Sequence, residues 1–147
     1  MEKAKQNLKV ISWALLALVV LAVITNTITL CANGLPQVNE VPEGITKEIA
    51  DVIAIITCVI GYIVFIPQIY VGIKGVKISN GADASGKAHK IWAIILGVFA
   101  VISVISGLSD FANGFDASKL ISVANAALDV ALYVLYYIYA DRIAKAQ

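Results

Sequence analysis

One aspartate stands near the middle of the last apolar segment of the chain. Asp129 has Asn125 and Tyr133 four residues to either side, a spacing that places all three on one face of a helix. An aspartate at the centre of a membrane helix costs about 2.5–3.5 kcal/mol on insertion scales. Two interpretations remain open: a polar cavity in which Asp129 binds a cation or carries a proton, or a hydrogen-bonded aspartate that holds helices together.

Other polar residues fall at a similar depth in the remaining apolar segments. A cavity around Asp129 is expected to recruit some of them, and they are Thr25, Asn26, Thr57, Cys58, Ser103 and Ser106. In the functional interpretation this cavity opens toward the outer side of the membrane. The candidate binding residues are therefore Asp129, Asn125, Tyr133, Thr57, Ser103 and Ser106.

The remaining reactive residue types predict no catalytic or metal site. His89 is the only histidine and lies beside Trp92 in a basic stretch, so we expect it to face solvent or lipid headgroups. No Cys/His cluster has metal-ligand spacing, and no serine lies in a nucleophile motif. Cys58 lies about 13 Å inside its helix while Cys31 lies near its surface, so we expect two free thiols. We predict no metal, no cofactor and no enzymatic activity.

Composition identifies the class of protein. Of the 147 residues, 60% are hydrophobic and 14% are charged, whereas soluble domains carry about 25% charged residues. The formal net charge of +1 gives no reason to expect nucleic-acid binding. The chain is predicted to be a small protein embedded in the lipid bilayer.

Apolar runs predict an all-α protein with four transmembrane helices at 10–31, 49–73, 91–108 and 118–140. The first run has no charge between Val10 and Leu30, which is long enough to cross a hydrocarbon core of about 30 Å. It is also longer than the apolar core of a signal peptide, so we expect it to be retained. Pro67 is expected to kink the second helix near one end.

The basic residues predict the orientation. Nine of them lie before the first helix, in the stretch 74–90 or after the fourth helix, and the two outer loops hold only Lys47 and Lys119. Both termini are therefore expected in the cytoplasm of a cell (plasma or inner) membrane. The simplest role of the four central lysines is to keep their loop on the cytoplasmic side during membrane insertion; they are Lys74, Lys77, Lys87 and Lys90. Contact with anionic headgroups or with a cytoplasmic partner is the alternative. Six aromatic residues are expected at the same interface: Trp13, Tyr70, Trp92, Tyr136, Tyr137 and Tyr139.

The two halves of the chain resemble each other. Trp13 corresponds to Trp92, the Asn33–Gly34 turn to Asn113–Gly114, and Thr46–Lys47 to Ser118–Lys119. Further along, Tyr62 and Lys74 correspond to Tyr133 and Lys145. This order predicts a tandem duplication of a helical hairpin, with two parallel repeats in one transmembrane domain. Asp129 aligns with Cys58, so the acid would belong to one half alone.

Two stretches resemble known families. Ile66-Pro67-Gln68-Ile69-Tyr70, followed by Lys77, Ser79 and Gly81, resembles the PQ-loop of small-solute transporters. The segment 49–108, with Tyr70-Val71-Gly72-Ile73-Lys74-Gly75 at its centre, resembles the hairpin core of VirB2/TrbC-type pilins. It is equally similar to small uncharacterised four-helix bacterial membrane proteins. The first resemblance implies transport, and the second implies self-assembly or membership of a secretion-type complex.

The sequence therefore favours a non-enzymatic membrane component. Our leading expectation is a protein that self-associates, or an accessory subunit of a larger membrane assembly. Four helices with short loops leave little room for a substrate path within one chain. Gly61, Gly97 and Gly107 offer small surfaces for close helix contact. The alternative is a small-solute or ion transporter or channel centred on Asp129.

Overall fold

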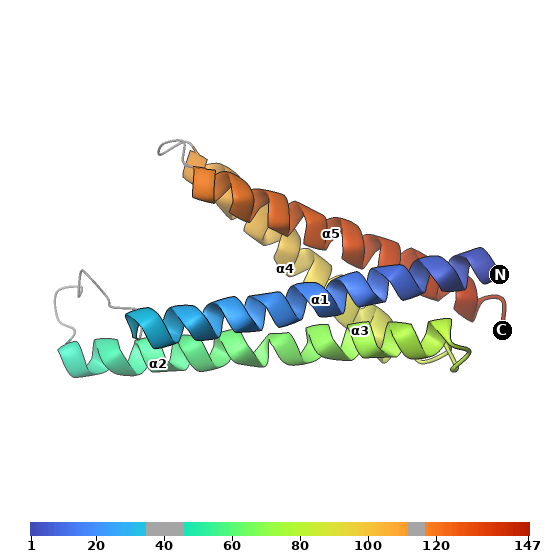
Figure 1. Ribbon diagram of the computed structural model, residues 1–147, viewed down its shortest axis with the longest axis horizontal. Helices are drawn as coiled ribbons and strands as arrows, with labels where there is room; N and C mark the ends of the chain where they lie inside the picture. Colours follow the sequence, from blue (N-terminus) through green and yellow to red (C-terminus); the bar gives the residue numbers. More distant parts are fainter. Residues whose placement is uncertain (35–45, 112–116) are drawn as a thin grey trace.

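The structure, a computed structural model, describes residues 1–34, 46–111 and 117–147. Within these ranges the chain forms α1 (Glu2–Asn33), α2 (Lys47–Ile63), α3 (Phe65–Ser79), α4 (Ala88–Phe111) and α5 (Ala117–Ala144). Only Val64 separates α2 from α3, and the two run nearly end to end (Figure 1). The described residues thus contain four helical segments that are long and apolar enough to span a membrane. The expected all-α class is confirmed. The centres of the two predicted outer loops, 35–45 and 112–116, lie outside the described residues.

The helices extend beyond the apolar runs. α3 continues to Ser79, so Lys74 and Lys77 belong to a helix, and the stretch predicted as a loop at 74–90 shortens to 80–87. The helix ends where Gly81 takes a positive φ of 104°. There the N–H of Ala82 bonds the carbonyl of Lys77, and the N–H of Gly81 bonds that of Ile78. This is a Schellman arrangement, which the apolar pattern alone does not reveal.

The break at Val64 lies three residues before Pro67. Proline has no N–H, so the carbonyl of Ile63 lacks its intrahelical donor, and the ring crowds that turn. The discontinuity therefore appears one turn before the proline. Tyr62 and Phe65 flank the break with their rings edge to face, 6.0 Å apart.

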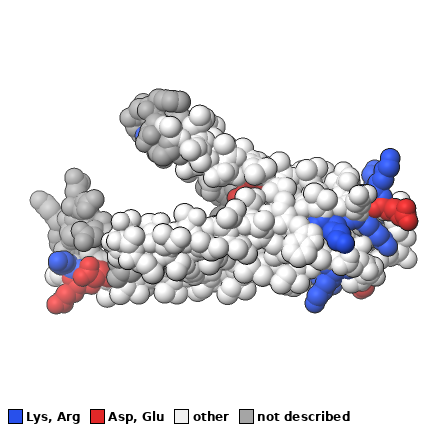
Figure 2. All heavy atoms as spheres, in the orientation of Figure 1, with Lys and Arg blue, Asp and Glu red and all other residues white. Residues whose placement is uncertain are grey.

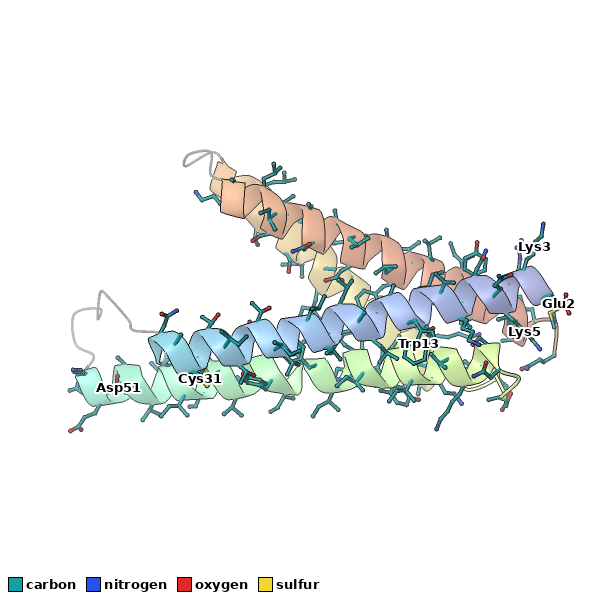
Figure 3. The ribbon with its side chains drawn as sticks, viewed as in Figure 1. Glu2, Lys3, Lys5, Trp13, Cys31 and Asp51 are labelled. Atoms are coloured by element: carbon teal, nitrogen blue, oxygen red, sulfur yellow. The ribbon has the colours of Figure 1, made fainter. Side chains whose placement is uncertain are left out.

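The helices form two arms that meet at one end and diverge at the other (Figure 1). α1 with α2 and α3 makes the first arm, and α4 packed along α5 makes the second. α1 packs chiefly on α3 and also on α5. Both termini and most of the basic side chains gather at the end where the arms meet (Figure 2). Glu2, Lys3 and Lys5 lie at this basic end, while Cys31 and Asp51 lie at the far end of the first arm (Figure 3).

The core lies at the basic end. Its largest fully buried members, which include Leu8, Val71, Ile78, Tyr136 and Ile143, come from α1, α3 and α5. Two glycines let α3 approach α1: a Cβ on Gly72 would lie 2.6 Å from Leu16 Cγ, and one on Gly75 would collide with Ser12 Oγ and the Tyr136 ring. Close helix contact through small residues is the usual packing device within membranes.

The glycines expected to offer contact surfaces behave differently from one another. A Cβ on Gly107 would lie 2.5 Å from Val123 Cγ2, so this glycine already serves the contact between α4 and α5. Gly97 faces Tyr133 of the same arm at an ordinary distance. Around Gly61 there is nothing within 4 Å. Of the three, Gly61 alone presents an open surface.

The contact of three helices at Gly75 predicts a stability difference. We expect Gly75→Ala to lower the free energy of unfolding by about 1–3 kcal/mol, because neither Ser12 nor the Tyr136 ring can yield without shifting a helix. Gly61→Ala is the matched control and should be neutral or slightly stabilising. Unfolding midpoints in detergent measure both. Equal midpoints for the two variants would contradict the packing described at Gly75.

Candidate functional site

Asp129 lines a pocket at the vertex between the two arms. The pocket has a volume of about 130 Å³ and is walled by α1, α3 and α5. Its polar members are Asp129, Gln68 and Tyr133, and the apolar members are Leu15, Leu18, Val19, Ala22 and Phe65. Acidic atoms are visible where the arms begin to diverge (Figure 2). Residues from three helices therefore converge on the carboxylate.

The carboxylate of Asp129 lies deep in the apolar segment and has no partner in the described part of the chain. It stands ten residues from Lys119 and fifteen from Ala144, about 15 Å and about 22 Å along α5. No hydrogen bond or ion pair from the described residues reaches it, and it is partly buried. A half-enclosed acid without a partner is the arrangement that a cation or a proton would complete.

The other predicted binding residues do not join this pocket. Asn125 is exposed one turn away on α5. Thr57 lines a separate pocket of about 250 Å³ with Asn26, Cys58 and Tyr62, and its hydroxyl donates to the carbonyl of Ile53. Ser103 and Ser106 are exposed on α4, where the Ser103 hydroxyl donates to the carbonyl of Phe99. Of the six, only Asp129 and Tyr133 come together.

The thiols are free, as expected. Cys31 is exposed and Cys58 is partly buried, and neither forms a disulfide. At this end of the first arm, the Thr27 hydroxyl donates to the carbonyl of Val23 and lies 2.9 Å from the Tyr62 hydroxyl. This contact between the two hydroxyls links α1 to α2.

The four central lysines have different surroundings. Lys77 and Lys87 are exposed and Lys74 is partly exposed. Lys90 has an exposed side-chain fraction of only 16% and pairs with Asp141 at 3.0 Å, which joins α4 to α5. Asp141 also accepts a 2.8 Å contact from Lys145, and this hydrogen bond raises the pKa of Lys145. Lys90 thus binds within the chain, while the other three remain available to lipid or a partner.

The expectation for His89 is wrong. Its exposed fraction is 0%, and its ring packs edge to face on Tyr136 with centroids 6.1 Å apart. Tyr136, expected at the membrane interface, is equally buried. α4 begins at Ala88, so its first turn carries His89 inward between the other helices.

Ser12, His89 and Tyr136 form what we call the junction cluster. Their side-chain polar atoms are buried and have no hydrogen-bond partner among the described residues. Such atoms are costly to bury. The end at which the arms meet therefore combines close apolar packing with buried polar atoms that lack hydrogen bonds. Nearby, Asn7 donates to the Tyr139 hydroxyl at 2.9 Å, a satisfied bond between α1 and α5.

Sequence reasoning missed Gln68 as a member of the pocket. In the sequence, Gln68 stands out only as part of the Pro67–Gln68 pair. The register of α3 brings it onto the face that meets α1 and α5. Depth along the helices selected Thr57, Ser103 and Ser106, but depth carries no information about which face a residue occupies.

The burial of His89 generates a prediction. His89→Phe keeps the edge-to-face contact with Tyr136 and removes two unpartnered nitrogens, so we expect stability unchanged or raised by about 1–2 kcal/mol. Trp92→Phe, at an exposed neighbouring position, is the control. Unfolding midpoints in detergent decide the outcome. A loss above about 1 kcal/mol specific to His89→Phe would mean that the imidazole has a hydrogen-bonding partner.

No protein-family model, no curated protein and no solved structure gives a significant match to this chain. The site itself must therefore carry the argument for function.

Proposed function

We propose that this chain is a non-enzymatic membrane transport protein in which Asp129 binds a proton or a cationic solute in turn. The observation that carries the proposal is the carboxylate of Asp129 near the middle of α5, which three helices half enclose and which has no hydrogen-bond or ion-pair partner among the described residues. One carboxyl group holds a single proton or a single positive charge at a time, which couples the movement of one to the other. Gln68, from the stretch that resembles PQ-loop transporters, lines the same pocket.

The shape of the molecule supports an access route from one side. Packed side chains fill the basic end, and the helices of the two arms diverge toward the opposite end (Figure 1). We propose that the basic end faces the cytoplasm of the cell membrane with both termini inside. The support is the positive charge gathered there (Figure 2). In this orientation Asp129 is reached from outside, and transport requires the basic end to open.

We further propose that the two arms are duplicated hairpins that move as units. The support is the ordered correspondence of Trp13 with Trp92, of the Asn-Gly turns and of Tyr62 with Tyr133. The contacts agree with separate units, since α4 packs mainly on α5 and α1 mainly on α3. Relative rocking of two repeats around a central site is a common transport motion.

Asp129→Asn tests the proposal. The amide keeps a similar shape but cannot carry a proton or a negative charge, so we expect proton flux coupled to cation addition to fall at least tenfold. The assay is the response of a pH-sensitive dye trapped in proteoliposomes. Asp51→Asn makes the same chemical change at an exposed position on α2 and should retain the flux.

Size-exclusion chromatography and circular dichroism would show whether Asp129→Asn remains folded. A folded variant with unchanged flux would rule out Asp129 as the coupling group. A variant that loses its fold would favour the alternative, in which the aspartate only holds helices together.

A second candidate is self-association, alone or within a larger membrane assembly. It is favoured by the open surface at Gly61, where nothing lies within 4 Å of an added Cβ. Native mass spectrometry of the detergent-purified protein should then show a defined oligomer or a co-purifying membrane partner. Gly61→Leu, which adds bulk to that surface, should shift the mass toward monomer. A monomer in the unmodified protein would count against this candidate.

A further inference from the structure

The lining of the Asp129 pocket restricts the kind of cation that fits it. Three lining residues carry acceptor atoms: the carboxylate of Asp129, the amide oxygen of Gln68 and the hydroxyl of Tyr133. The other five residues are apolar. Among divalent metal ions, Ca²⁺ needs about six to eight oxygen ligands and Mg²⁺ needs about six. Among the described residues no group of three or more His, Cys, Asp or Glu is placed to hold a metal.

A primary ammonium matches this lining better than a metal ion. Its nitrogen has three N–H donors, one for each acceptor group, and one positive charge for one carboxylate. Its alkyl chain would lie against Leu15, Leu18 and Val19 from α1. Phe65 and Tyr133 add aromatic rings, which attract ammonium groups.

The pocket size sets an upper limit on the ligand. An apolar cavity of about 150 Å³ holds a benzene-sized molecule, so about 130 Å³ suits an amine of five or six heavy atoms. A larger amphiphile would extend into the opening between the arms. The walls come from both arms, because α1 and α3 belong to the first and α5 to the second. Occupation would therefore hold the two arms together at the vertex.

Resting on the proposed function, we propose that the Asp129 pocket binds small primary alkylammonium ions. The carboxylate provides the charge, Gln68 and Tyr133 provide the other two acceptors, and the α1 side chains select for an apolar body. Quaternary ammonium ions of equal charge lack N–H donors and bind more weakly. Sodium and potassium lack the apolar body and bind more weakly still.

Binding of n-butylammonium chloride to the detergent-purified full chain tests this proposal, with heat of binding and thermal unfolding as readouts. We expect saturable binding and a raised unfolding temperature for the unmodified protein. Tetramethylammonium, sodium and potassium at equal ionic strength should bind at least tenfold more weakly. Asp129→Asn should abolish binding, and Gln68→Leu should weaken it about tenfold while narrowing the preference for butylammonium over tetramethylammonium. Asp51→Asn should bind as the unmodified protein does.

The failures of the two proposals can be told apart. Equal binding of butylammonium and sodium, or butylammonium binding that survives in Asp129→Asn, would overturn the ammonium assignment. If the flux in proteoliposomes still depends on Asp129 in that case, transport stands and only the solute class is wrong. If Gln68→Leu leaves both the affinity and the preference unchanged, the three-acceptor assignment is wrong.

Discussion

The close approach of α1 and α3 at Gly72 and Gly75 is the contact on which the rest of the structure depends. Because glycine has no side chain, Leu16 and Ser12 of α1 and the ring of Tyr136 from α5 can pack directly against α3 at these two positions. Bilayer lipids are as apolar as leucine, so burial of apolar surface gives little drive for helices to associate within a membrane. Close packing must supply it instead. The arms join where this packing is possible and diverge beyond it.

This junction determines the environment of Asp129. Tyr136 is buried at the basic end. Tyr133, one turn earlier on α5, is also buried and lines the Asp129 pocket. One further turn brings Asp129 to the point where the arms begin to separate. The carboxylate is thus partly enclosed by α1 and α3 but not sealed. Unsatisfied polar atoms in the junction cluster make the closed end costly to maintain.

Much of the fold follows from the sequence because the length of an apolar run is a one-dimensional signal. The four membrane-length helices, the free thiols and the special position of Asp129 are of this kind. The helix face on which a side chain lies is not such a signal, because nearly every residue in these segments is apolar and the hydrophobic periodicity is weak. Sequence alone therefore predicts that His89 faces solvent or headgroups and that Tyr136 lies at the membrane interface, whereas both are buried between helices, and it does not reveal Gln68 as a member of the pocket. The extension of α3 through Lys74 and Lys77 depends on the cap at Gly81 rather than on hydropathy.

A solute site at the vertex requires that water reach the Asp129 pocket. The measurement is the labelling rate of Ala22→Cys, which lines the same pocket and leaves the Asp129 carboxylate in place, by a charged thiol reagent, with Cys31 and Cys58 replaced by serine. We expect this cysteine to be labelled in membranes and butylammonium to slow the labelling, whereas Ile121→Cys, at an exposed apolar position of α5, should label slowly and without such protection. Absence of labelling until the protein is denatured would show that the position is sealed within the protein or lipid. That result would contradict a solute site at the vertex.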